Sequence, residues 1–202
     1  SGKMKSREGT VVDADDLMEE MVQTAKERTE ELGKTADFSE ADRQALYQTI
    51  GMGALKYFLL KVDPKKRLLF DPAESVDFQG HTGPFIQYTY ARIKSVLRRA
   101  AYAETLALPL DKPLSIYERD LIQALGNFPA VIQASASEFS PAQLANYVYE
   151  VAKLYNKFYH EESILKAEDE GVKNFRLHLS AVAAHVIAKS MLLLGIAVPE
   201  RM

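Results

Sequence analysis

The sequence contains no cysteine, which excludes disulfides and thiolate metal sites and fits a reducing, cytoplasmic setting. No apolar run approaches the roughly 20 residues that a membrane-spanning helix requires, so we expect no membrane contact. There is also no excess of positive charge, because the formal net charge is −3 at pH 7. Any contact with nucleic acid must therefore depend on local basic patches.

Short signatures of free-standing enzyme sites are absent as well. The sequence has no His-Glu-x-x-His, no Gly-x-Ser-x-Gly, no Gly-Lys-Ser/Thr phosphate loop and no dinucleotide fingerprint. The four histidines are scattered, and His178 and His185 are seven residues apart, too far along one predicted helix to form a metal pair. We therefore predict no metal site, and no cofactor bound by this chain alone.

What is present indicates a folded protein made mainly of helices. The 202 residues are 47% hydrophobic and 26% charged, as in soluble globular proteins, and suffice for one large or two small domains. The chain opens with Ser1-Gly2 and a charged loop rather than a plausible first element, so we expect it to be a piece of a longer protein.

Helical patterns occupy the first part of the chain. Asp13 is a candidate N-cap for a helix that ends near Gly33, and Ser39 is one for a helix that runs through Ile50. Glycines 51 and 53 are predicted to loosen the chain there. Residues 57–60 fit either a buried helix or a strand, and residues 62–72 are predicted to form a loop at a domain boundary.

The second part of the chain predicts a helix bundle. Four helices are expected: from Thr82-Gly83-Pro84 to about Ala107, from the Ser115–Glu118 capping box to Gly126, from Ser140-Pro141 onward, and from Val172 to Leu194. Gly195 would close the last of them. The predicted fold is thus mainly α, with an antiparallel helix bundle over residues 73–202 preceded by a small helical connector within residues 1–72.

Residues 3–9, Lys-Met-Lys-Ser-Arg-Glu-Gly, form a cation-rich loop. Alone, such a segment is most often a solvated terminus. Its sequence resembles the signature loop of class I aminoacyl-tRNA synthetases, in the altered form of arginyl enzymes, although Lys5 and Ser6 stand in swapped order relative to the common Lys-Met-Ser-Lys-Ser. The resemblance implies that Lys3, Lys5, Ser6 and Arg7 hold the ATP triphosphate in a site that is incomplete here.

Two further segments resemble arginyl-tRNA synthetases. Residues 80–93, Gly-His-Thr-Gly-Pro-Phe-Ile-Gln-Tyr-Thr-Tyr-Ala-Arg-Ile, are similar to the entry into their anticodon-binding domain, and residues 53–58 fit the pattern before it. The last four residues, Pro-Glu-Arg-Met, match their usual ending. The three motifs stand in the family's order and together extend over residues 3–202.

The resemblance implies the C-terminal part of an arginine–tRNA ligase. Residues 1–72 would be the edge of the catalytic domain with the signature loop and connector helices, and residues 73–202 the anticodon-binding bundle. The full-length parent would use ATP with Mg to attach arginine to its tRNA. This chain lacks the nucleotide-binding sheet with its His-x-Gly-His type motif, so alone it would be inactive. The expected partner is the tRNA specific for arginine, not DNA, and we expect a cytoplasmic monomer.

Candidate tRNA-binding residues follow from these motifs and from composition. Unpaired bases are recognised by stacking on aromatic rings and by hydrogen bonds to their edges, and phosphates by arginine. Aromatic stripes are often core, and basic stripes such as Lys94, Arg98 and Arg99 are equally often solvated helix faces, so the pattern leaves both alternatives open. The predicted tRNA-binding residues are Phe85, Tyr88, Arg92, Arg98, Arg99, Tyr155, Asn156, Tyr159, His160 and Met202.

Within residues 154–160, Leu154 and Phe158 are expected to point inward, and Tyr159 toward the edge of the apolar stripe. Met202 is expected to pack beside the anticodon pocket. The alternative function is a helical bundle that docks a protein partner. The acidic net charge favours that alternative, whereas the three ordered motifs disfavour it.

Overall fold

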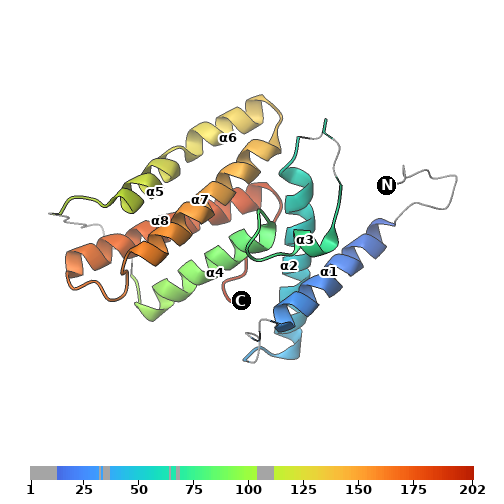
Figure 1. Cartoon of the computed structure of the whole chain (residues 1–202), viewed down its shortest axis with the longest axis horizontal. Helices are drawn as coiled ribbons and strands as arrows, with labels where there is room; N and C mark the ends of the chain where they lie inside the picture. The colour runs from blue at the N-terminus through green and yellow to red at the C-terminus, as the bar shows by residue number, and fades with distance from the viewer. Residues whose placement is uncertain (1–12, 32, 34–36, 64, 67–68, 104–111) are drawn as a thin grey trace.

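The computed structural model describes residues 13–31, 33, 37–63, 65–66, 69–103 and 112–202. Within these ranges all regular secondary structure is helical, as predicted, and no helix there is long and apolar enough to cross a membrane. The helices, shown in Figure 1, are α1 (Ala14–Glu31), α2 (Glu40–Leu60), α3 (Pro72–Ser75), α4 (Gly83–Arg99), α5 (Ile116–Gly126), α6 (Phe128–Ser137), α7 (Pro141–Glu161) and α8 (Glu170–Leu193).

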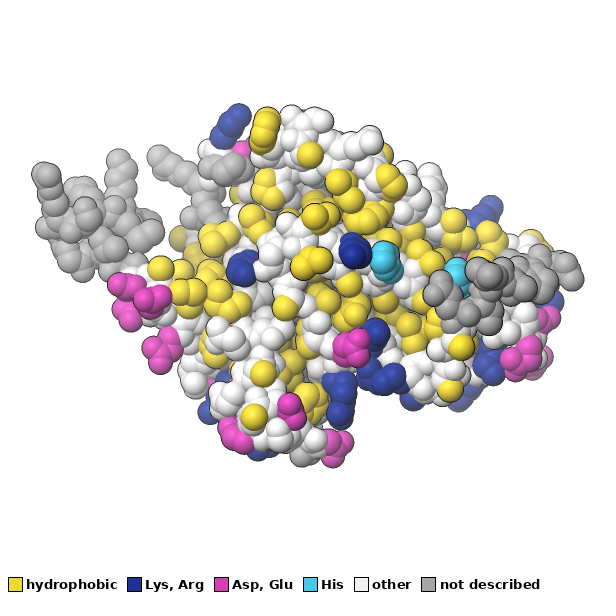
Figure 2. Space-filling view, turned by 180° about the vertical axis from the view of Figure 1, so that it is seen from behind, with side chains coloured by type: hydrophobic (Ala, Val, Ile, Leu, Met, Phe, Trp, Pro, Cys, Tyr) yellow, Lys and Arg dark blue, Asp and Glu magenta, His cyan; other side chains and the backbone are white. Residues whose placement is uncertain are grey.

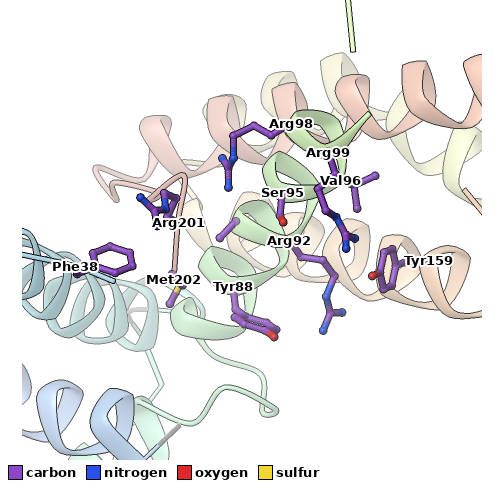
Figure 3. A pocket seen from close by; sticks show the side chains of 11 residues that line it. Phe38, Tyr88, Arg92, Ser95, Val96, Arg98, Arg99, Tyr159, Arg201 and Met202 are labelled. Atoms are coloured by element: carbon purple, nitrogen blue, oxygen red, sulfur yellow. The ribbon is translucent and has the colours of Figure 1, made fainter. Parts of the chain in front are cut away.

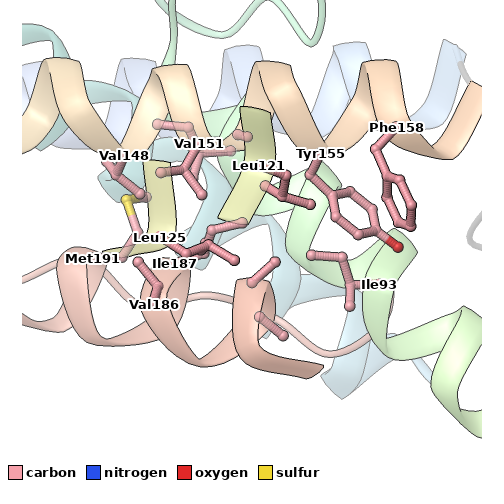
Figure 4. Close-up of a cluster of buried hydrophobic side chains, with 14 of the residues drawn as sticks. Ile93, Leu121, Leu125, Val148, Val151, Tyr155, Phe158, Val186, Ile187 and Met191 are labelled. Carbon is pink, nitrogen blue, oxygen red and sulfur yellow. The ribbon is translucent and has the colours of Figure 1, made fainter. Parts of the chain in front are cut away.

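The helices surround two hydrophobic cores. Helices α4, α5, α7 and α8 enclose the larger one, in which Ile93, Tyr155, Phe158 and Ile187 are fully buried (Figure 4). The smaller core lies between α1, α2 and the chain around Val76, beside the bundle (Figure 1). The helix bundle is therefore confirmed, whereas the boundary at residues 72–73 stays a prediction.

Side-chain caps begin several helices where the sequence predicted them. Thr82 Oγ1 accepts a hydrogen bond from the Phe85 N–H at 3.3 Å, and Ser39 caps α2 in the same way through Asp42. Ser115 and Glu118 form the complete capping box of α5. These caps fix where each helix begins, because they satisfy N–H groups of the first turn that have no partner within the helix.

Two features of the bundle differ from the prediction. Helix α4 ends at Arg99 rather than near Ala107, because Ala101 adopts a left-handed conformation with φ of 46° and the Tyr102 N–H bonds the Leu97 carbonyl at 3.0 Å. This closure uses no glycine, so the sequence carries no usual stop signal. Helix α6 was not predicted, because it follows α5 directly and its N-cap Asn127 makes no side-chain cap.

The prediction that Gly51 and Gly53 loosen the chain was wrong, since α2 continues unbroken through both and includes residues 57–60. These glycines allow other helices to approach closely. A Cβ at Gly51 would lie 2.8 Å from the Met21 carbonyl oxygen of α1, and one at Gly53 would lie 2.4 Å from Nε2 of Gln87. Their small size thus serves packing between helices rather than a break within one.

A Gly51→Ala substitution is expected to destabilise the protein by about 1–3 kcal/mol, the usual range for overpacking. The colliding atoms are α1 backbone, so the whole helix must move. The matched control is Gly126→Ala at the end of α5, where a Cβ meets no heavy atom within 4 Å. That variant should be neutral or stabilised by up to about 1 kcal/mol. Urea unfolding measures both, and equal changes would contradict the packing role.

Candidate nucleic-acid interface

A groove of about 510 Å³ lies between α4, the end of α7 and the C-terminal tail, residues 195–202 (Figure 3). We call it the arginine groove, because four arginines line it and, among the described residues, no carboxylate side chain does. Figure 2, in which the molecule is seen from behind relative to Figure 1, shows several Lys and Arg side chains below the centre of that face, with Asp and Glu side chains among them. The lining residues are Phe38, Tyr88, Ala91, Arg92, Ser95, Val96, Arg98, Arg99, Tyr159, Arg201 and Met202.

Helical spacing positions most of this lining. Tyr88, Arg92, Ser95 and Arg99 follow one another at intervals of four, three and four residues, so they share one face of α4. Helix α7 runs in the same direction as α4 (Figure 1) and adds Tyr159 from the position after the buried Phe158. The groove thus forms where the polar edges of two core helices meet.

Arg92 lies at the centre of the groove, between two aromatic rings (Figure 3). Its guanidinium carbon is 5.0 Å from the ring centroid of Tyr88 and 5.2 Å from that of Tyr159. Its Nη1 also donates a hydrogen bond to Oδ1 of Asn156. The π faces of both rings attract the cation, so the guanidinium is held in a defined place between α4 and α7.

The C-terminal tail forms another wall of the groove. Nη1 of Arg98 donates to the Glu200 carbonyl at 3.0 Å, and Nζ of Lys94 lies 2.9 Å from Oε1 of Glu200. The hydrogen bond to Glu200 raises the pKa of Lys94. The guanidinium carbon of Arg201 lies 4.9 Å from the Phe38 ring centroid. These contacts join the tail to α4 and to the chain just before α2.

The earlier part of the tail is held by hydrogen bonds from two side chains, the buried Gln87 and the exposed Lys56. Nε2 of the fully buried Gln87 donates to the Ala197 carbonyl at 2.8 Å and to the Thr49 carbonyl of α2 at 3.0 Å. Nζ of Lys56 donates to the Gly195 carbonyl at 2.7 Å. The tail then ends at Met202, which packs against the smaller core. Its position therefore depends on both α2 and α4.

A second pocket adjoins the groove and shares Tyr88 and Arg92 with it. Its volume is about 360 Å³. Phe85, Asn156 and His160 line it, so it continues along the seam between α4 and α7. The two cavities together place aromatic rings, cations and amide groups along one continuous strip of surface.

The structure gathers nine of the ten predicted tRNA-binding residues at these two cavities, although their contact with tRNA stays a prediction. Tyr155 is the exception, and its assignment was wrong. It is fully buried in the bundle core (Figure 4), its hydroxyl lies 3.3 Å from Oγ of Ser180, and burial raises its pKa. It follows Val151 by four residues and precedes Phe158 by three, which is the spacing of the core face.

Among the polar and aromatic residues that line the arginine groove, the sequence prediction missed three. Ser95 had a signal, because it lies seven residues after Tyr88 on the same face of α4. Arg201 stands beside Met202 in a motif already noted. Phe38 had none, since its place in the groove depends on the packing of α2 against α4. The predicted ATP-loop residues Lys3, Lys5, Ser6 and Arg7 lie outside the described residues.

Comparison with known proteins gives consistent matches. Residues 86–202 match the family model described as DALR anticodon binding domain. The chain is 56% identical to the arginine–tRNA ligase of Flavobacterium psychrophilum over 202 residues, all of this chain and 33% of that protein. It is 55% identical to that of Bacteroides fragilis, covering 34% of it.

Solved structures agree with these matches. The arginyl-tRNA synthetase of Thermus thermophilus superposes with a TM-score of 0.86 at 31% identity, over 96% of this chain and 33% of that one. The arginyl-tRNA synthetase from Plasmodium falciparum superposes with a TM-score of 0.81 at 24% identity, over 95% of this chain and 34% of that one, which shows the shared fold. The chain thus spans about a third of the length of its curated relatives.

Proposed function

Since this chain belongs to the DALR anticodon binding domain family, we propose that it binds the anticodon region of a tRNA in the arginine groove. The observation that carries the proposal is Arg92 held between Tyr88 and Tyr159 in a groove lined by three further arginines. A single-stranded loop offers unpaired bases beside a phosphate backbone. Aromatic and guanidinium planes stack on such bases, and arginine forks bind phosphates.

We propose further that the whole protein is an arginine–tRNA ligase, of which this chain is the C-terminal part. The curated relatives that it matches along its whole length are named arginine–tRNA ligases, which supports arginine tRNA as the partner. ATP with Mg would be a substrate of the whole protein, and the chain alone would not attach arginine. We also propose that the protein is a monomer located in the cytoplasm, and the absence of cysteine fits the reducing conditions of that compartment.

Binding of the arginine tRNA is expected to weaken with salt, but only moderately. The net charge is −3, and four arginines line the groove, so about three to five phosphate contacts are expected. Each contact contributes about −0.7 to −0.9 to the slope of the logarithm of the binding constant against the logarithm of the salt concentration. The expected slope is therefore about −2 to −4.5. Fluorescence anisotropy with an unmodified tRNA transcript measures this slope.

Two controls separate this function from its alternative. The same transcript with its anticodon replaced should bind more weakly, and duplex DNA of similar length should bind weakly or not at all. If the chain binds none of these nucleic acids at low salt, the proposal fails and a protein partner of the bundle becomes the better hypothesis. If every tRNA bound with equal affinity, the groove would not distinguish anticodons, and the anticodon part of the proposal would be wrong.

A further inference from the structure

Both polar atoms of the Asn156 side chain are already engaged within the protein. Its Oδ1 accepts from Nη1 of Arg92, and its Nδ2 donates to Oγ1 of Thr89 at 2.8 Å. The orientation of the amide is fixed by chemistry, because a guanidinium has only donors and must face the oxygen. The Asn156 amide therefore has one partner on its oxygen and one on its nitrogen in the folded chain, and these two partners set its orientation.

Thr89 anchors this arrangement in the backbone of α4. It is fully buried, and its hydroxyl donates to the Phe85 carbonyl at 2.8 Å. Since that hydroxyl has used its only hydrogen, it can meet Asn156 only as an acceptor. A chain of hydrogen bonds thus runs from the α4 backbone through Thr89 and Asn156 to the guanidinium of Arg92.

These hydrogen bonds determine the orientation of the Arg92 guanidinium. The two rings attract its cation without fixing its rotation, whereas the hydrogen bond to Asn156 sets the plane of the guanidinium. Only one of its five N–H donors has a partner among the described residues, so the others remain available to a ligand. A side chain that is ordered before binding loses less entropy when the ligand arrives.

We infer that Asn156 is a positioning residue, which with Thr89 holds the Arg92 guanidinium in the orientation that meets RNA, and does not itself contact RNA. The inference rests on the proposed function for its final step. It changes the role of Asn156 from the RNA contact that the sequence suggested to a support for the neighbouring cation. It also gives a role in recognition to Thr89, a residue that RNA cannot reach.

The first test needs no RNA. In the ¹⁵N-labelled chain, the Nε–H signal of Arg92 should be displaced by the ring currents of Tyr88 and Tyr159. Asn156→Ala and Thr89→Val should each move this signal toward the position of a free arginine. Thr89→Ser, which keeps the hydroxyl, should preserve it. An unchanged Arg92 signal in both Asn156→Ala and Thr89→Val would overturn the inference.

The second test measures affinity for the arginine tRNA transcript. Asn156→Ala and Thr89→Val should each weaken binding about tenfold, as expected when the hydrogen bond that positions a charged group is lost. Thr89→Ser, which keeps the hydroxyl, should bind with wild-type affinity. In an Arg92→Ala background the same changes should cost nothing more. A loss that persists undiminished in that background would mean that Asn156 contacts RNA directly. If the wild-type chain binds no tRNA, the proposed function fails, whereas the NMR comparison still decides the positioning.

Discussion

An Arg92→Ala variant is expected to bind the arginine tRNA about 10- to 100-fold more weakly than the wild type, because one stacking contact or charged hydrogen bond is worth about 1–3 kcal/mol. The substitution removes the central cation of the arginine groove and its contacts with Tyr88 and Tyr159. Arg92 lies outside the bundle core, so the melting temperature should change by only a few degrees. Anisotropy titration and thermal unfolding measure the two quantities.

The matched control is Arg119→Ala. Arg119 is an exposed arginine of α5 that does not line the groove, and its removal changes the net charge by the same amount. It should leave the affinity within about twofold of the wild type, since an exposed charge away from the interface acts only through screened, long-range attraction. If both variants weakened binding equally, the effect would come from overall charge, and the groove would have no special role.

A Tyr155→Ala variant is expected to lose about 3–5 kcal/mol of folding free energy, the usual cost of removing a buried aromatic ring. Its ring is fully buried between α7 and α8, and its hydroxyl lies near Ser180. Tyr155→Phe keeps the ring and loses one hydrogen bond, worth about 1 kcal/mol. Urea unfolding measures both.

The same pair tests the correction of the Tyr155 assignment. Tyr155→Phe should bind tRNA with wild-type affinity, because a fully buried hydroxyl cannot reach RNA. Tyr159, four residues further along the same helix, provides the contrast, since it lines the groove. A Tyr155→Phe variant that loses as much affinity as Arg92→Ala would show that the tyrosine contacts RNA and that its core assignment is wrong.

The parts of the fold that the sequence predicted are those with a local chemical signal. Thr82 and Ser115 begin their helices through bonds to residues three positions away, so a short window of sequence contains the whole interaction. The errors arose where the deciding contact is distant. Gly51 is a usual signal for a helix break, and only the position of α1 shows that it serves close packing. Helix α4 ends at an alanine with positive φ, Ala101, and no glycine near it in the sequence predicts that end.

The residues of the candidate site also fall into those with a local sequence signal and those placed by distant contacts. Tyr88, Arg92 and Arg99 could be predicted because one helix face carries them all. Phe38 could not, because it reaches the groove only after α2 has packed against α4. The core position of Tyr155 was predictable, because Tyr155 stands four residues after Val151 and three before Phe158, which was expected to point inward.

Because the C-terminal tail is anchored beside the groove, its position determines at which end of the chain a tag can be attached. Because Met202 lines the groove and Arg201 lies against Phe38, a purification tag or reporter fused after Met202 would begin inside the groove. Such a fusion would add a flexible competitor to the surface proposed to receive RNA and would remove the charge of the terminal carboxylate of Met202, a residue that lines the groove. Affinities, screening data and immobilisation formats are better obtained with the fusion partner attached ahead of residue 1.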